Sequence, residues 1–177
     1  MKITDVIAFT LQGDAEQLNV LVEERQVGLL DAHAEYRERG PSQPGRPGPG
    51  GKRVIEHSYV QIDTDEGASG LFGPINSDQA TIIVRRLKPF LVGKDPLAYE
   101  KVWDVMYRHD RHARKGLTMM AISAVDNALW DLRGKLQGLP VYRLLGGPSR
   151  ERIPAYASML GHSLEVGPVV QRAQEVA

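Results

Sequence analysis

The chain has 177 residues, 42% of them hydrophobic and 25% charged, which is an ordinary globular composition for one domain, or for one domain and part of another. Lys and Arg together number 22, as do Asp and Glu, so no net charge favours nucleic acid or an anionic membrane as a partner. The absence of cysteine excludes disulfides, thiolate metal sites and a cysteine nucleophile. Residues 1–6 begin no sustained apolar run, so we expect no signal peptide, no membrane span and a cytoplasmic location.

The first 51 residues fall into three segments of different composition. Residues 2–11 alternate and are rich in Ile, Val, Phe and Thr, which predicts a strand. Residues 14–39 interleave charges with Leu and Val, and their spacing predicts a helical face that includes Leu29, Leu30 and His33. In residues 40–51, nine of twelve are Gly or Pro, a composition that predicts a mobile loop without helix or strand pairing.

The next segment has the pattern of a β-hairpin. Residues 54–63 alternate apolar and polar side chains, residues 63–67 are turn formers, and residues 68–72 return as a second strand. A helix is expected next, with Ser77 or Asp78 as its N-cap and apolar residues up to Leu91.

Two more helices are predicted before the chain changes character. The segment 93–96 breaks the first helix, and Pro96 fits the first turn of the second, which extends to Met106. The third covers residues 117–132, where apolar side chains recur at three- and four-residue steps, and Gly138 and Pro140 end it. Residues 153–160 then form a short apolar run, and residues 166–177 begin a helical pattern. Strands, then helices, then a new β–α start indicate an α+β domain followed by the opening of another unit.

The third helix and the turn after it carry the longest motif in the chain. It comprises Ala121, Ser123, Ala124, Val125, Asp126, Ala128, Leu129, Asp131, Leu132, Gly134, Lys135, Pro140, Val141, Leu144, Leu145 and Gly146. This pattern resembles the signature of the mandelate racemase and muconate lactonizing enzyme family of the enolase superfamily. The resemblance implies a three-stranded antiparallel sheet with a helical bundle as an N-terminal capping domain, residues 1–150. Residues 151–177 would then be the first strand (153–159) and the start of the first helix of an incomplete (β/α) barrel.

The family reaction implied by this resemblance removes the proton α to a carboxylate, using a Lys or His base and Mg²⁺. In relatives, the base and the three metal-binding carboxylates lie on later barrel strands, and a whole barrel takes roughly 250 residues. We therefore expect no catalytic residue and no metal ligand in this chain, with Mg²⁺ bound only by a full-length relative. Residues 114–120 look most similar to rhamnonate-type sugar-acid dehydratases, which implies an aldonate dehydratase acting on a small sugar acid, as a homo-oligomer. The alternatives are a racemase or cycloisomerase of the same family, or a truncated, non-catalytic chain acting as an interaction remnant.

Two polar clusters contain residue types that could form a site. Asp126 and Asp131 are five residues apart, about 140° around a helix, so they point in different directions and do not form an acid–base pair. Within the signature they are interpreted as structural, together with Gly134, Lys135, Pro140 and Gly146. Residues 108–115 are densely basic, but the neutral chain and the lone His109–His112 pair argue for a loop between helices over a nucleic-acid or metal site.

The substrate-binding candidates follow from the family, in which two loops of the cap close over the barrel mouth. By order along the chain these loops fall within residues 13–53 and 56–76. Polar side chains there that suit a hydroxylated acid are His33, Arg46, Lys52 and Arg53. Ser158 falls at the C-terminal end of the expected first barrel strand, where barrel enzymes place functional groups.

Overall fold

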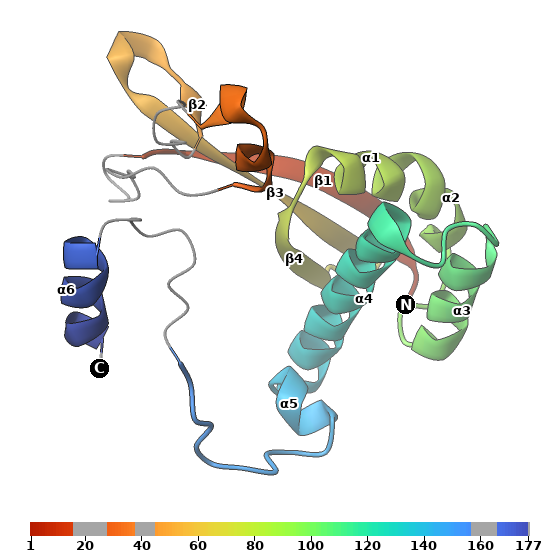
Figure 1. Cartoon of the computed structure of the whole chain (residues 1–177). Coiled ribbons are helices and arrows are strands. Elements are labelled where there is room, and N and C mark those ends of the chain that lie inside the picture. The colour runs from red at the N-terminus through yellow and green to blue at the C-terminus, as the bar shows by residue number, and fades with distance from the viewer. Residues whose placement is uncertain (16–27, 38–44, 157–165, 177) are drawn as a thin grey trace. The chain divides into compact units, whose positions relative to one another are not determined.

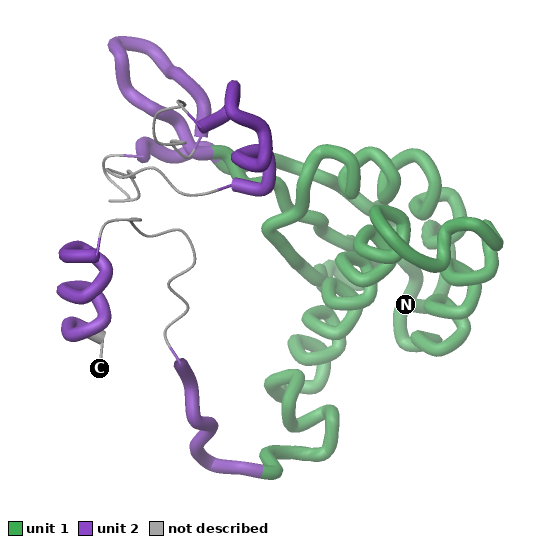
Figure 2. The backbone as a smooth tube through the Cα atoms, in the orientation of Figure 1, with its two compact units in different colours: residues 1–11, 56–149 green, residues 12–55, 150–177 purple. Residues whose placement is uncertain are grey.

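A computed structural model describes residues 1–15, 28–37, 45–156 and 166–176 (Figure 1). The chain divides into two compact units (Figure 2): unit 1 comprises Met1–Leu11 and Glu56–Ser149, and unit 2 comprises Gln12–Ile55 and Arg150–Ala177. Strands and helices are both present, and the sheet contains antiparallel pairs, which confirms the predicted α+β class. Each unit is described by itself below.

The sheet is built around β3 (Arg53–Thr64), the most extensively paired strand. It pairs with β1 (Ile3–Asp14) and, in antiparallel register with Gln61 opposite Leu71, with β4 (Ser69–Ile75). These three strands are the ones expected from sequence.

A fourth, two-residue strand corrects the expectation that residues 40–51 pair with nothing. This strand, β2 (Arg46–Pro47), lies antiparallel to β3, with Pro47 opposite Arg53. Such a short ladder needs few N–H donors, so a proline is tolerated in it. Gly45, with φ of 74°, lies so close to the Val54 carbonyl group that a Cβ atom would not fit.

Unit 1 buries its apolar residues between the sheet and the helices. Val60 and Ile62 of β3 alternate inward and are fully buried. Helix α4 (Gly116–Gln137) packs along β4, and helices α1 (Ser77–Ile82) and α3 (Tyr99–Arg108) contact α4 (Figure 1). The core that results includes Ile3, Val6, Leu87, Val102, Met106, Ile122, Val125 and Leu129.

The helical segment 77–91 begins one or two residues earlier than predicted and is not regular. Asn76, not Ser77 or Asp78, is the N-cap: its side chain accepts from the Gln79 N–H at 2.8 Å, and the Gln79 side chain accepts from the Asn76 N–H at 2.8 Å. This reciprocal pair is a capping box, which an Asn–x–x–Gln spacing can form as Ser–x–x–Glu does. After α1, a π turn (Ile83–Leu87) leads into α2 (Lys88–Leu91). Pro89 lacks the N–H that a regular helix would need there, which accounts for the irregular turn.

Helix α3, by contrast, begins later than predicted, because its N-cap is Ala98 and Pro96 precedes the helix. The end of α4 agrees with the prediction: Gly138, at φ of 64°, caps it, and α5 (Val141–Leu144) starts after Pro140.

Unit 2 departs from the sequence expectations in two places. The part of the expected helical face that is described, residues 28–37, forms two 3₁₀ turns, η1 (Leu29–Ala32) and η2 (Ala34–Tyr36), and Leu29 is 98% exposed. Residues 153–156, the described part of the strand expected over 153–159, form no strand, because a strand exists only through hydrogen bonds to a neighbour and none of the described strands pairs with them; residues 157–159 lie outside the described residues. Another 3₁₀ turn, η3 (Pro49–Gly51), precedes β3, and α6 (Val166–Val176) forms where a helix was expected.

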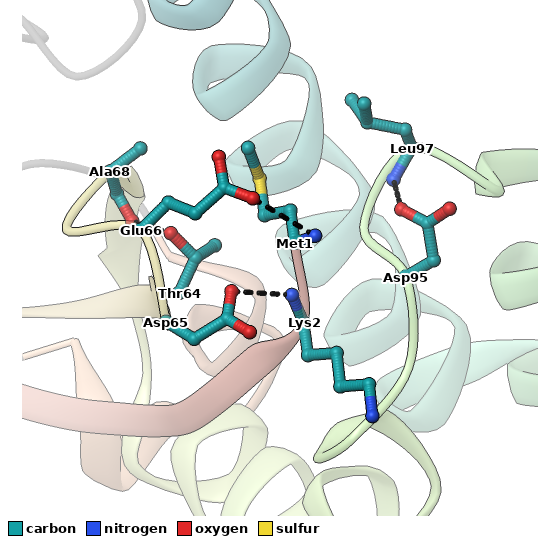
Figure 3. Close-up of polar contacts among 8 residues, drawn as sticks. All are labelled: Met1, Lys2, Thr64, Asp65, Glu66, Ala68, Asp95 and Leu97. Atoms are coloured by element: carbon teal, nitrogen blue, oxygen red, sulfur yellow. Dashed lines mark hydrogen bonds and ion pairs between the residues drawn. The ribbon is translucent and has the colours of Figure 1, made fainter.

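The β3–β4 turn is tied to the start of β1 by polar contacts (Figure 3). The Thr64 hydroxyl donates to the Ala68 carbonyl at 2.7 Å, closing the turn. The Lys2 N–H donates to Asp65 Oδ1 at 2.7 Å, and the Asp65 N–H returns a bond to the Lys2 carbonyl at 3.0 Å. The amino group of Met1 pairs with Glu66 at 3.0 Å, and this hydrogen bond raises the pKa of that amino group. The turn therefore fixes where β1 enters the sheet.

Candidate functional site

The predicted substrate-binding residues all belong to unit 2, and the first of them lies in the turn 28–37. This turn is held by its own polar groups: the Gly28 N–H donates to Asp31 Oδ2 at 2.8 Å, and Arg37 Nε donates to the Asp31 carbonyl at 2.8 Å. His33 sits between the two 3₁₀ turns, with its ring exposed and edge-on to Tyr36, centroids 6.3 Å apart. Within the described residues its imidazole makes no hydrogen bond or ion pair, so it is accessible to a ligand.

Arg46 and Arg53 lie on the paired strands β2 and β3, but on opposite faces of this ladder. Pro47 lies opposite Arg53 in the ladder and Arg46 lies opposite Val54. Opposite residues share a face and successive residues alternate, so the two arginines start from opposite faces of the ladder. Arg53 is half-buried, and its Nη2 donates to the Gly45 carbonyl at 2.7 Å, whereas Arg46 is exposed. Arg53 therefore braces β2, and Arg46 is the more exposed of the two.

The remaining candidates in unit 2 are Lys52 and Ser158. The ammonium group of Lys52 pairs with Asp14 at 3.1 Å, so its charge is compensated within the unit. Ser158 lies outside the described residues.

In unit 1, the polar signature residues of α4 hold this helix on the edge of β4. Asp131 Oδ2 accepts from the Leu71 N–H at 2.7 Å and from Lys135 Nζ at 2.7 Å. Lys135 Nζ also donates to the Ser69 carbonyl at 3.1 Å. We call these four residues the α4–β4 clamp. The clamp satisfies backbone groups of β4 that its pairing with β3 leaves open.

The small signature residues shape the turn after α4. Gly134 lies against the Leu139 carbonyl, and a Cβ atom there would approach it to 2.9 Å; the Leu139 N–H donates back to the Gly134 carbonyl at 2.9 Å. Pro140 is the N-cap of α5, and Gly146, at φ of 109°, follows its end. A hollow of about 410 Å³ beside this turn includes Asp131 and Lys135 in its lining, but both are engaged with β4.

The other polar cluster, residues 108–115, is the loop between α3 and α4, as expected. His109 Nδ1 donates to the Met106 carbonyl at 2.6 Å, and Arg111 Nε donates to His112 Nε2 at 3.1 Å. Each of the two imidazoles therefore forms a hydrogen bond with a residue close to it in the chain. Across the described parts of the chain, no three His, Asp or Glu side chains are grouped so that they could hold a metal ion, so those residues do not fit a Mg²⁺ site.

Asp126 and Asp131 differ as their spacing predicts. Asp131 belongs to the clamp, whereas Asp126 is half-buried, and no described residue bonds to its carboxylate. Burial raises the pKa of Asp126, and attraction to Arg133 partly offsets this.

Sequence reasoning missed Arg133, which is only 4% exposed and lies against the rings of Tyr99 and Trp130. A signal was available: Arg133 follows Leu129 by four residues, on the second apolar face of α4, where a charge would need a partner.

Comparison with known proteins identifies the family to which this domain belongs. The N-terminal domain model of the mandelate racemase/muconate lactonizing enzyme family matches residues 51–146, more than half of the chain. The chain belongs to this family. The match covers β3, β4 and all the helices of unit 1, up to the glycine after α5.

Relatives within the family include sugar-acid enzymes. A D-galactonate dehydratase of Verminephrobacter eiseniae is 42% identical over 101 residues, which are 55% of this chain and 26% of that protein. Among solved structures, an enolase-superfamily member of Polaromonas sp. JS666 is 26% identical with a TM-score of 0.68, over 99% of this chain and 41% of that one. The 3,6-anhydro-D-galactonate cycloisomerase of Zobellia galactanivorans is 28% identical with a TM-score of 0.55, over 83% of this chain and 32% of that one.

The chain matches about a quarter of the length of the curated relatives, so what it shares with them is the N-terminal domain. None of the helices in the described ranges is long and apolar enough to cross a membrane.

Proposed function

We propose that this chain is the N-terminal part of an enolase-superfamily enzyme that removes the proton α to the carboxylate of a sugar acid and dehydrates it. The observation that carries the proposal is the family's N-terminal domain in unit 1, at 42% identity to a D-galactonate dehydratase. An aldonate is the substrate class that this relative's name suggests.

The contribution of this chain to such a reaction is recognition of the substrate. His33, between two 3₁₀ turns, and Arg46, in β2, are exposed polar side chains of unit 2, and an imidazole or guanidinium group suits a hydroxylated carboxylate. Arg53 supports them by fixing β2 through the Gly45 carbonyl. Ser158 remains a candidate for the same role.

The base and the Mg²⁺ ligands would come from a barrel of the kind that full-length relatives carry. Mg²⁺ there would stabilise the negative charge that develops when the α-proton leaves. The described residues of this chain offer no such ligand group.

A chimeric enzyme tests the proposal. Residues 1–150 of this chain replace the corresponding domain of the Verminephrobacter eiseniae D-galactonate dehydratase, and the rate of D-galactonate dehydration is measured with Mg²⁺. We expect an active chimera, in which Arg46→Ala raises KM about tenfold with little change in kcat, because a lost charge-assisted contact weakens binding.

The matched control is Arg85→Ala, which removes an exposed arginine from unit 1 and should leave KM unchanged. The chain alone, given D-galactonate and Mg²⁺ in deuterated water, is expected to incorporate no deuterium. A folded chimera without activity, or equal effects of the two arginine substitutions, contradicts the proposal.

The second candidate reaction is a cycloisomerisation, favoured by the likeness to the Zobellia galactanivorans enzyme. To test it, residues 1–150 are joined to that enzyme's barrel, and the rate of each chimera is divided by the rate of its parent enzyme. A cycloisomerase function predicts a higher ratio for the cycloisomerase chimera on 3,6-anhydro-D-galactonate than for the dehydratase chimera on D-galactonate. The opposite ranking favours the dehydratase.

A further inference from the structure

Arg133 is the only charged side chain among the buried polar residues that the structure describes; the others are Thr64 and Gln79. A helical side chain of this length leans toward the N-terminus of its helix, which takes the guanidinium of Arg133 back over Trp130. Its Cζ lies 4.2 Å from the Trp130 ring and 3.7 Å from the ring of Tyr99 on the adjacent α3. The ring centroids are 5.9 Å apart, which is less than the two Cζ–ring distances added together. The rings therefore do not lie on opposite sides of the cation but form a corner around it.

Both rings attract the guanidinium over their π faces, a contact that gives its N–H groups no lone-pair acceptor. Nε and Nη2 of Arg133 are both enclosed, and no described group accepts a hydrogen bond from either of them. These two nitrogens belong to the same edge of the planar group, the one whose parallel N–H bonds match the two oxygens of a carboxylate. A buried cation with unpaired donors is strongly disfavoured, and a cation–π contact compensates only part of that penalty.

The surrounding side chains do not supply the missing acceptor. Asp126, two turns back on α4, attracts Arg133 electrostatically without forming an ion pair. Burial lowers the pKa of Arg133, as expected for a cation without a contacting counter-charge. Tyr99, by contrast, is 42% exposed on the first turn of α3, so one wall of the corner can move into solvent.

We propose that the Nε–Nη2 edge of Arg133, at the corner of Tyr99 and Trp130, is a binding site for one carboxylate group. The carboxylate enters as the Tyr99 ring moves aside, and it accepts two hydrogen bonds from Arg133. It is supplied by a small carboxylic acid or by an Asp or Glu of a second copy of this chain. This site lies in unit 1 and does not depend on the proposed enzymatic function.

The tryptophans of the chain allow a direct test with all 177 residues. There are two, so Trp103→Phe leaves Trp130 as the sole indole, 4.2 Å from the cation. Sodium acetate is titrated against sodium chloride at equal ionic strength while Trp130 emission is recorded. A small-acid site predicts a saturable change with acetate that chloride does not produce.

Two variants at position 133 show whether the change depends on the guanidinium edge. Arg133→Lys keeps the charge but loses the two parallel N–H bonds of the guanidinium edge, and should weaken acetate binding about tenfold or more. Arg133→Met should abolish the saturable change. The matched control is Arg114→Met, which removes a guanidinium that lies over the exposed side of α3, 4.8 Å from the Tyr107 ring, and should bind acetate as the parent does. Circular dichroism verifies that each variant is folded.

A second arm detects a carboxylate from another copy. Sedimentation velocity over a dilution series should then show self-association of the wild type and of Arg114→Met, with Arg133→Lys and Arg133→Met shifted to monomer. Identical emission responses to acetate and chloride, together with the same oligomeric state in wild type and in whichever position-133 variant folds, would overturn the proposal.

Discussion

Substitution of Asp131 by Ala tests whether the α4–β4 clamp holds unit 1 together. The change removes the acceptor of the Leu71 N–H, a hydrogen bond to a charged group worth about 1.5–3 kcal/mol. Water can reach this strand edge, so the lower end applies, about 1.5 kcal/mol. The ion pair with Lys135 adds about 0.3–0.5 kcal/mol. The total of about 2 kcal/mol corresponds to a Tm at least about 8 °C lower for a unit of about a hundred residues.

Urea unfolding followed by far-ultraviolet circular dichroism measures this loss, and Asp131→Asn is its control. Asparagine keeps an acceptor for the Leu71 N–H but loses the charge, so we expect about half the effect. Combining Asp131→Asn with Lys135→Met should cost less than the sum of the two single changes, because both remove the same ion pair. A stability of Asp131→Ala within about 0.5 kcal/mol of wild type would refute the reasoning, since water would then replace the clamp fully.

Two further predictions concern α4. Gly70→Ala should destabilise unit 1 by about 1–3 kcal/mol in the same urea assay, because its Cβ would lie 2.8 Å from Leu132 Cβ and closer still to the Ala128 carbonyl; unchanged stability would mean that α4 can shift away from β4. Asp126→Asn should raise the Tm at pH 7 and leave it unchanged near pH 3. Burial raises the pKa of Asp126 in the folded state, so the folded chain favours the neutral acid and loses stability as pH rises through that pKa. A lower Tm at pH 7 would show that attraction to Arg133 outweighs burial.

The sequence best predicted the strands and helices whose conformation depends on residues close to one another in the chain. The alternation of residues 2–11 and 54–63 gave strands, and the apolar steps of residues 117–132 gave a helix ended by Gly138, since these patterns report which face is buried and where the backbone must turn. The N-cap was misplaced by one or two residues because Asn76 is as good a cap as Ser77 or Asp78, and only the pairing with Gln79 decides among them.

The errors arose where distant contacts decide the conformation. Arg46 and Pro47 form a strand because β3 is available to pair with them, which no local composition of Gly and Pro reveals. Residues 153–156 have the apolar composition of a strand but no described partner, so they remain without one. For Arg133 the local pattern indicates burial, since it lies on the second apolar face of α4, but its contact with Tyr99, 34 positions earlier on another helix, cannot be predicted from that pattern.

The signature of the family can now be interpreted in physical terms. Asp131 and Lys135 are a carboxylate and an amine, the groups that acid–base chemistry would use, yet both bind main-chain groups of β4. Gly134 permits the chain to return along α4, and Pro140 starts the next helix. These contacts fix how the helix meets the sheet, and by themselves they do not identify a reaction. The dehydratase and the cycloisomerase that resemble this chain carry different activities in their names, so a shared fold does not decide the reaction, and in the proposal above His33 and Arg46 contribute recognition of the substrate.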